Sequence, residues 1–467
     1  MILPLIKELD DHIDKDNHKN YRPVSNLEFV GKLVERVVSK RLVKHMTDNS
    51  LHSDFEHGYK AFHSPETLLL KVVNNLLISC DKQMPSIVML LDLSAAFDTV
   101  DQSKLLNILE NEIGIEGTAL KWFSSFLKGR TQKVKIGESY SEECELEYGV
   151  AQGSVLGPYL FNIYIRSLKK YVEPSNFEIF GFADDHQLLK TFLPAFQVFA
   201  LDGDINNCFK LIDQWMNKFF LKLNASKTKI LIVMPPSLRK HIVIQGTFIQ
   251  QSCIRFVQSA KNLGVVLDDE LSFKHQVQKV VKSCFFTIRK LSKIKDFLSY
   301  EQLRTAVCAY IFANLDYCNS LYYGINSALL DKLQYVQNSA ARLLRKKNNC
   351  FREFSTLQCI RQCHWLRIRE RIVFKLCLMV HKCLLGKAPN CLIELISFCQ
   401  TERTVKLTPY AHKGAYGNRC FARVGPKLWD LLPPTVREES DTDVFKKKLK
   451  TYLFDGYERL AQKLKER

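Results

Sequence analysis

The chain lacks several features that would assign it to a familiar class at once. No uninterrupted apolar run approaches the 18 residues of a bilayer-crossing helix. The opening MILPLI is too short for the apolar core of a signal peptide and runs directly into acidic residues. We therefore expect an intracellular protein that is neither secreted nor inserted in a membrane.

Cysteine spacing argues against a structural metal site. The chain has 15 cysteines, but the densest region, residues 350–399, contains no C-x₂-C pair of the kind typical of zinc sites. In a long chain without a secretory leader, reduced thiols are the better interpretation. The stretch RIVFKLCLMVHKCLL there is typical of an apolar helix that carries thiols.

Charge is distributed very unevenly. Residues 1–280 contain 33 basic and 33 acidic residues, so the whole net charge of +18 lies in the last 187 residues. Such asymmetry favours a polyanion held by one lobe of the protein, although a solubilising basic surface would have the same composition. A nucleic acid is the expected partner class.

Three aspartates carry the most informative pattern. Asp92 ends the apolar strand SIVMLLDL (residues 86–93), and Asp184-Asp185 interrupts the apolar stretch FEIFGFADDHQLLKT (residues 177–191). If the fold brings them together, they form the carboxylate cluster that two Mg²⁺ ions about 3.5–4 Å apart require for phosphoryl transfer. Taken singly, the pair is typical of a hairpin turn in which Asp adopts a positive φ, and Asp92 is typical of a helix cap.

Segments around these aspartates predict alternating strands and helices. YRPVS is extended, and in the following helix Leu33, Val34, Val37, Val38 and Leu42 share one face. Arg22 and Lys60 lie near turns where they could meet a triphosphate or remain solvated surface charges.

Further segments could approach the same site. Phe97 follows Asp92 closely, whereas Asp98 and Asp101 are better explained as helix caps. The loop GVAQGSVLGP contains Gln152, which can donate and accept, and Gly153, which permits close backbone approach. These elements predict an α+β catalytic unit over residues 1–274.

Beyond Lys274 the pattern becomes helical, amphipathic and basic. We expect a thumb-like helical region over residues 275–350 and a basic helical C-terminal region over residues 351–467.

Six segments together resemble the reverse transcriptases of non-LTR retrotransposons, the long interspersed elements, and look closest to the chicken-repeat and Jockey-like lineages. They are YRPVS, LDLSAAFDTVD, AQGSVLGP, FADD, LNASKTK and KNLGVVLDDELSF, in the family's order over residues 20–275. The tail FARVGPKLWDLLPPTVREESDTDVFKKKLKTYLF resembles the end of such polyproteins. The resemblance implies a right-hand polymerase, with fingers and a palm built on a ferredoxin-like sheet, followed by a helical thumb.

The resemblance also implies roles for individual residues. Asp92, Asp184 and Asp185 would bind two Mg²⁺ ions, with Mn²⁺ as a possible substitute. Lys227 would lie near the leaving pyrophosphate, and Phe97 would exclude a ribose 2′-OH. The remaining implied contacts are nucleotide or template binding by Arg22, Lys60, Gln152 and Gly153, and a primer grip at Leu263 and Gly264.

The chain departs from the family pattern at three places. Ala151 stands where Pro commonly precedes the Gln-Gly pair, and Lys60 stands where the family usually has Arg. Lys keeps the charge but loses the planar fork that binds phosphate bidentately. The endonuclease that such elements usually carry upstream is not in this sequence, so we expect the chain to copy nucleic acid without nicking a target.

Two hypotheses follow. In the first, the chain is an RNA-directed DNA polymerase that uses an RNA template, a DNA primer and dNTPs, with no protein partner indicated. In the second, it is a truncated, inactive element-derived protein that only binds nucleic acid. Both predict salt-sensitive binding, so only an assay of DNA synthesis separates them.

Overall fold

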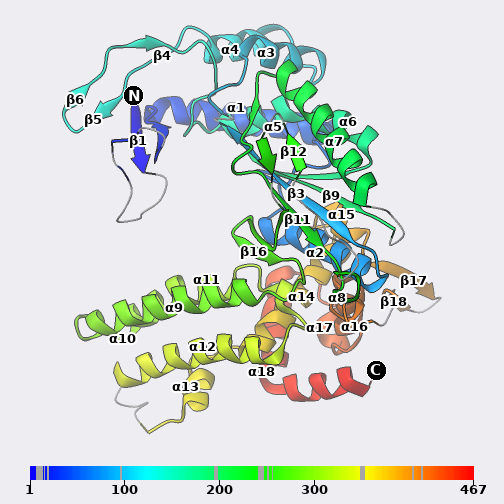
Figure 1. Ribbon diagram of the computed structural model, residues 1–467. Coiled ribbons are helices and arrows are strands. Elements are labelled where there is room, and N and C mark those ends of the chain that lie inside the picture. Colours follow the sequence, from blue (N-terminus) through cyan, green and yellow to red (C-terminus); the bar gives the residue numbers. More distant parts are fainter. Residues whose placement is uncertain are drawn as a thin grey trace.

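The chain forms a C-shaped molecule with an upper arm, a spine that contains the main sheet, and a lower helical arm (Figure 1). The computed structural model describes all residues except 7–13, 15, 18–19, 95–96, 194–197, 240–246, 250–251, 255, 348–352, 402–403, 412–413 and 467. In the described part, no helix is both long enough and apolar enough to cross a membrane.

The spine is a mainly antiparallel sheet with β3 at its centre. Its strand order is β14 (Phe256–Val257), β11 (Lys229–Val233), β3 (Ser86–Ser94), β9 (Asp185–Thr191) and β8 (Glu178–Phe182), with β10 (Lys222–Leu223) also paired to β3. The strand predicted over residues 86–93 is therefore confirmed.

Alternate residues of β3 supply two hydrophobic cores, because successive side chains of a strand point to opposite faces. Val88 belongs to one core, and Ile87, Met89 and Leu91 belong to the other. This two-sided burial explains why β3 is apolar along almost its whole length.

The second core joins the sheet to helices of the upper arm (Figure 1). Its helices are α1 (Phe29–Asp48), α3 (Gln102–Asn111), α4 (Gly117–Leu127), α5 (Gly157–Ile165), α6 (Leu168–Val172) and α7 (Val198–Lys218). Short strand pairs extend this region: β1 (Ile2–Ile6) with β2 (Tyr21–Ser25), β4 (Thr131–Gln132) with β7 (Cys144–Glu145), and β5 (Lys135–Ile136) with β6 (Ser139–Tyr140).

The first core runs without interruption from helix α2 (Pro65–Asp81) to the C-terminal helix. Its later helices are α9 (Lys274–Ile294), α10 (Tyr300–Val307), α11 (Ala313–Asp316), α12 (Ser327–Lys347), α13 (Thr356–Gln362), α14 (Ile368–Leu384), α15 (Asn390–Ile393), α16 (Phe421–Asp430), α17 (Pro434–Arg437) and α18 (Thr442–Glu466). The remaining elements are α8 (Pro236–Arg239) and the pairs β12 (Thr247–Ile249) with β13 (Ser252–Ile254), β15 (Ser259–Asn262) with β16 (Val265–Asp268), and β17 (Ser397–Thr401) with β18 (Thr404–Thr408).

Polar contacts also tie the C-terminal region to helix α2. Lys375 on α14 lies 2.7 Å from the Glu66 carboxylate on α2, and the Ala422 amide donates to the Asn74 side chain at 3.0 Å. The predicted boundary at residue 274 coincides with the first residue of α9, whereas the one at residue 350 lies outside the described residues. The C-terminal region thus shares one hydrophobic core with α2 and one face of the sheet.

Helix α1 is oriented differently from the predicted apolar face. Leu42 is buried, but Leu33, Val34 and Val37 are 43%, 45% and 55% exposed. Glu35, which follows Val34 in the sequence, is only 3% exposed. The side of α1 that packs against the protein therefore carries Glu35, whose buried hydrogen bonds are described below, and the apolar side carries residues that remain exposed.

Candidate active site

Strand pairing places two of the three predicted aspartates opposite each other. In the antiparallel register of β3 with β9, Asp92 is the direct partner of Asp185. Directly opposed residues have Cβ atoms about 4.5–5.5 Å apart. Asp184 lies in the two-residue turn between β8 and β9, immediately before Asp185, so the fold gathers the three carboxylates at one end of the sheet.

The turn differs from the sequence-based prediction in one respect. The positive φ, 59°, belongs to Ala183 and not to either aspartate. A left-handed conformation costs a non-glycine L-residue roughly 1–2 kcal/mol. The Ala183 N–H donates to Oε1 of Glu56 at 3.0 Å, so a buried carboxylate supports this unfavourable conformation.

Mutual repulsion is visible in the ionisation of Asp185. Its pKa is raised to about 6, first by partial desolvation and then by the negative charges of Asp184 and Asp92, while Lys261 acts in the opposite direction. Neighbouring carboxylates repel each other when all of them are ionised, and a cation placed between them stabilises the ionised forms.

The donor set fits a hard divalent cation that is completed by substrate. Among the described residues, no three His, Cys, Asp or Glu side chains form a ready-made metal cage. Mg²⁺ in phosphoryl-transfer sites is typically held by one or two carboxylates together with substrate phosphates and water. Asp92, Asp184 and Asp185 match that incomplete, open arrangement.

Lys227 lies beside the aspartates on a short turn. Its Nζ is 3.9 Å from Oδ2 of Asp92, with both side chains partly exposed. The turn is fixed because the Asn224 amide donates to the Asp92 carbonyl at 2.8 Å and the Lys227 amide donates back to the Asn224 carbonyl. Lys227 thus places an exposed cation next to the carboxylates.

Gln152 and Gly153 form a loop against the end of β2. The Ser25 amide donates to the Gln152 carbonyl at 2.7 Å, and a Cβ on Gly153 would lie 2.8 Å from the Ser25 carbonyl oxygen. The Gln152 side chain donates to the Asp98 carboxylate at 3.0 Å. The prediction that Asp98 caps a helix is therefore wrong, whereas Asp101 does cap α3 by accepting from the Lys104 amide.

The same loop is anchored by a residue that the sequence analysis missed. Oε2 of Glu35 accepts from the Ser154 hydroxyl at 2.5 Å, the Val155 amide at 2.6 Å and the Leu156 amide at 3.1 Å. A glutamate inside the apolar pattern of α1 was the available signal, because a buried carboxylate requires partners.

Phe97 is half-buried at the edge of the site. Its ring stacks on Phe161, with centroids 4.7 Å apart and planes inclined by 28°. Its carbonyl accepts from the Val150 amide at 2.8 Å, next to the Gln152 loop. The Phe97 ring therefore packs on helix α5, while its backbone is tied to the start of the loop that carries Gln152.

The two predicted phosphate contacts have different outcomes. The Lys60 ammonium donates to the Ser53 carbonyl at 3.1 Å, and burial lowers its pKa. Lys60 is thus turned toward its own fingers segment. The Arg22 side chain lies outside the described part of the structure.

Leu263 and Gly264 form the turn between β15 and β16. The Tyr317 hydroxyl donates to the Leu263 carbonyl at 2.7 Å, and Lys279 donates to the Gly264 carbonyl at 3.0 Å. A cavity of about 210 Å³ connects this turn with Asp185. The structure therefore brings the predicted primer grip next to the carboxylates.

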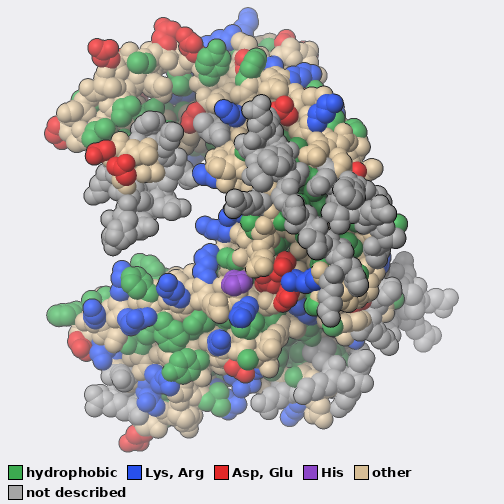
Figure 2. All heavy atoms as spheres, in the orientation of Figure 1, with side chains coloured by type: hydrophobic (Ala, Val, Ile, Leu, Met, Phe, Trp, Pro, Cys, Tyr) green, Lys and Arg blue, Asp and Glu red, His purple; other side chains and the backbone are tan. Residues whose placement is uncertain are grey.

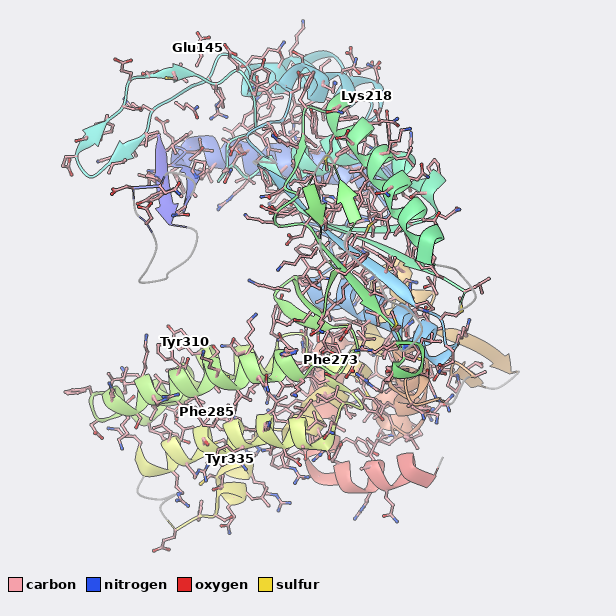
Figure 3. The ribbon with its side chains drawn as sticks, in the orientation of Figure 1. Glu145, Lys218, Phe273, Phe285, Tyr310 and Tyr335 are labelled. Carbon is pink, nitrogen blue, oxygen red and sulfur yellow. The ribbon has the colours of Figure 1, made fainter. Side chains whose placement is uncertain are left out.

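The inner surface of the C carries much positive charge. Lys and Arg side chains line the hollow between the arms, and acidic side chains gather at the tip of the upper arm (Figure 2). Phe285, Tyr310 and Tyr335 lie on the lower arm (Figure 3), where the Phe285 and Tyr335 rings are 5.8 Å apart.

Comparison with known proteins assigns the family. Residues 13–267 match the family described as reverse transcriptase (RNA-dependent DNA polymerase), and the chain belongs to it. This membership confirms the predicted α+β polymerase fold. The family generally uses divalent metal ions and binds a nucleic-acid template.

Named relatives come from non-LTR retrotransposons, as the sequence resemblance predicted. The chain is 25% identical over 342 residues to the probable RNA-directed DNA polymerase from transposon BS of Drosophila melanogaster, covering 71% of this chain and 36% of that protein. It is also 25% identical to the RNA-directed DNA polymerase from mobile element jockey of Drosophila funebris, covering 74% and 37%. The chain thus spans just over a third of the length of these relatives.

Among solved structures, apo telomerase from Candida tropicalis aligns with a TM-score of 0.38 and 11% identity. The alignment covers 73% of this chain and 54% of that one.

Proposed function

We propose that this chain is an RNA-directed DNA polymerase that extends a DNA primer on an RNA template. The observation that carries the proposal is the register of β3 and β9, which sets Asp92 opposite Asp185 beside Asp184 and Lys227. That arrangement supplies oxygen ligands and a cation at one point, which is what nucleotidyl transfer requires.

The three aspartates would hold two Mg²⁺ ions, for which Mn²⁺ could substitute. Bound there, the ions would lower the pKa of the primer 3′-OH and neutralise charge on the triphosphate. Asp92 and Asp185 would approach from facing strands, and Asp184 from the turn. Lys227 would place its ammonium near the departing pyrophosphate, where it can stabilise charge or donate a proton.

The surrounding residues would position the other reactants. Phe97, braced by Phe161, would contact the sugar of the dNTP and disfavour a ribose 2′-OH. Gln152 and Gly153 would contact the nascent base pair, and the Leu263–Gly264 turn would support the primer end. Arg22 and Lys60 remain candidate phosphate contacts, and for Lys60 this requires release from the Ser53 carbonyl.

The basic lower arm would follow the backbone of the RNA–DNA hybrid. Helix α9 begins directly after the β15–β16 turn region, and Lys279 already contacts the Gly264 carbonyl. Recognition through phosphates and groove shape would make binding strongly salt-dependent. The retrotransposon relatives favour the nucleus, the cytoplasm or both as the place of action.

Primer extension on oligo(rA)·oligo(dT) with Mg²⁺ tests the proposal. The parent chain should extend the primer, and the Asp184→Asn/Asp185→Asn variant should lose at least about 100-fold in rate while still binding the duplex. Asp48→Asn, an exposed position at the end of α1 paired with Lys44, is the control and should extend normally.

Two outcomes would contradict the proposal. Extension by the double variant would show that these aspartates are not the metal ligands. Salt-dependent duplex binding by a parent chain that extends no primer would favour the inactive nucleic-acid-binding protein.

A further inference from the structure

The segment of residues 55–58, between α1 and α2, lies directly against strand β8. The His57 amide donates to the Gly181 carbonyl at 2.8 Å, and the Gly181 amide donates to the Phe55 carbonyl at the same distance. Glu56, between these two contacts, is only 3% exposed. The segment therefore behaves as a short added edge of the sheet that carries a buried acid.

The Glu56 carboxylate occupies a slot formed by two glycines. Oε1 accepts from the Gly58 amide at 2.5 Å and from the Ala183 amide at 3.0 Å. A Cβ on Gly58 would lie 2.7 Å from the Ala183 nitrogen, and a Cβ on Gly181 would lie 2.6 Å from Oε2 of Glu56. Glycine at positions 58 and 181 therefore leaves the space that the Glu56 carboxylate occupies, because a side chain at either position would displace it.

The turn that follows β8 needs such an acceptor. The cross-strand pairs of the hairpin end at Phe182 and Asp185, so the Ala183 amide lies beyond the ladder. Ala183 is buried and has a left-handed φ of 59°. A buried N–H without an acceptor is strongly unfavourable. Glu56 supplies the acceptor from a position 127 residues away in the sequence.

We infer that Glu56 is a positioning residue, which acts on catalysis by holding the Ala183–Asp184 turn and thereby the Asp184–Asp185 pair in place. The inference rests on the proposed function, because it gives those aspartates their role. Glu56 itself touches neither substrate nor metal in this account. The hydrogen bond that Glu56 accepts from the Ala183 amide orients the backbone from which Asp184 projects, and the one from the Gly58 amide fixes the carboxylate itself.

Contacts to the same segment connect the turn to two further parts of the molecule. The Asn162 side chain on α5 donates to the Gly58 carbonyl at 3.0 Å. Sγ of Cys391 on α15 lies 3.9 Å from Nε2 of His57. The segment that carries Glu56 therefore contacts helix α5 and the C-terminal region as well as the sheet.

Hydrogen–deuterium exchange of the full chain tests the positioning without any assay of activity. Glu56→Ala should speed exchange of amides 181–186 by about tenfold or more, because the buried Ala183 amide loses its acceptor. Glu56→Gln keeps an oxygen acceptor and should stay close to the parent. The matched control is Glu370→Ala, which removes another buried glutamate, at the start of α14, and should leave exchange at residues 181–186 unchanged.

Primer extension supplies the second measurement. Glu56→Ala should lower kcat by about tenfold or more with little change in KM for the dNTP, and Glu56→Gln should restore kcat. Unchanged exchange at residues 181–186 in Glu56→Ala would overturn the inference even if the parent is active. Alternatively, exchange at residues 181–186 could become faster in Glu56→Ala while the parent chain extends no primer. That result would support the positioning role of Glu56 and reject the proposed function.

Discussion

Two loops of the candidate site are each held by a buried glutamate. The protein gives these two carboxylates different numbers of hydrogen-bond donors. Three donors from residues 154–156 converge on one oxygen of Glu35. Glu56 binds two amides through Oε1, while its Oε2 is buried without a hydrogen-bond partner among the described residues. Burial raises the pKa of Glu56 to about 7.

The loop of residues 152–157 is therefore anchored more firmly than the Ala183–Asp184 turn, whose anchor, Glu56, changes its charge with pH. The Glu35 carboxylate holds the loop of residues 152–157 through three hydrogen bonds from three successive residues, so that loop has several anchoring points. A carboxyl group with a pKa near 7 changes charge under ordinary conditions. The turn that carries Asp184 is thus the more adjustable of the two.

Removing Glu35 should give the largest loss of stability. In Glu35→Ala, the Val155 and Leu156 amides and the Ser154 hydroxyl lose their acceptor, and each buried unpaired donor costs about 1–3 kcal/mol. We expect the free energy of unfolding, measured by urea denaturation, to fall by about 4 kcal/mol. Glu35→Gln should recover part of it. A loss below about 1 kcal/mol would show that this loop is not held as described.

Glu56→Gln should change the pH dependence of stability. The native carboxyl binds its proton more tightly than the unfolded one, whose pKa is 4.5, so the parent loses stability as pH rises from 4.5 to 7. Gln does not ionise. Relative to Glu56→Gln, the parent should lose up to about 3 kcal/mol across this interval and nothing further above it. Parallel denaturation profiles of the two proteins would contradict the raised pKa.

Adding a methyl group at the glycine beside either glutamate-held loop should destabilise the protein. Gly153→Ala meets the Ser25 carbonyl and an unfavourable φ of 104°, and Gly58→Ala meets the Ala183 amide. Each should lower the free energy of unfolding by about 2 kcal/mol. The control is Gly203→Ala in α7, where an added Cβ has open space and should be neutral or stabilising. Thermal denaturation compares all three, and equal midpoints would refute the close packing.

Divalent cations should have the smallest effect on the free energy of unfolding. This effect should depend on the turn that carries Asp184 and Asp185. At ten times its dissociation constant, Mg²⁺ should stabilise the parent by about 1.4 kcal/mol. The gain should shrink below pH 6, because Asp185, whose pKa is raised to about 6, is then protonated. Thermal midpoints with and without Mg²⁺ provide the measurement. An equal gain in Asp184→Asn/Asp185→Asn would place the bound ion elsewhere.

Much of the site could be predicted because its signals are local. The apolar run before Asp92 defines a strand, and two apolar runs around Asp184-Asp185 define a hairpin. Each needs only neighbouring residues to be recognised. The order of six short motifs then predicted the family, which the comparison confirmed.

The positions that were predicted wrongly depend on distant partners. Asp98 accepts from Gln152, 54 residues later, instead of capping a helix. The apolar pattern of α1 placed Val34 and Val37 on one face, yet the helix leaves both exposed and turns Glu35 inward to bind a loop about 120 residues away. No local pattern distinguishes a glutamate that will find donors from one that will stay solvated.

By itself, the sequence determined the strand that ends in Asp92, the hairpin that carries Asp184 and Asp185, and the basic character of the last 187 residues. Periodicity and composition are local properties, so the linear chain contains them in full. Only the tertiary structure decided that Asp92 faces Asp185, that Ala183 takes the strained φ, and that Glu35 and Glu56 are buried. Strand register and the pairing of buried charges are set by contacts between residues far apart in the chain.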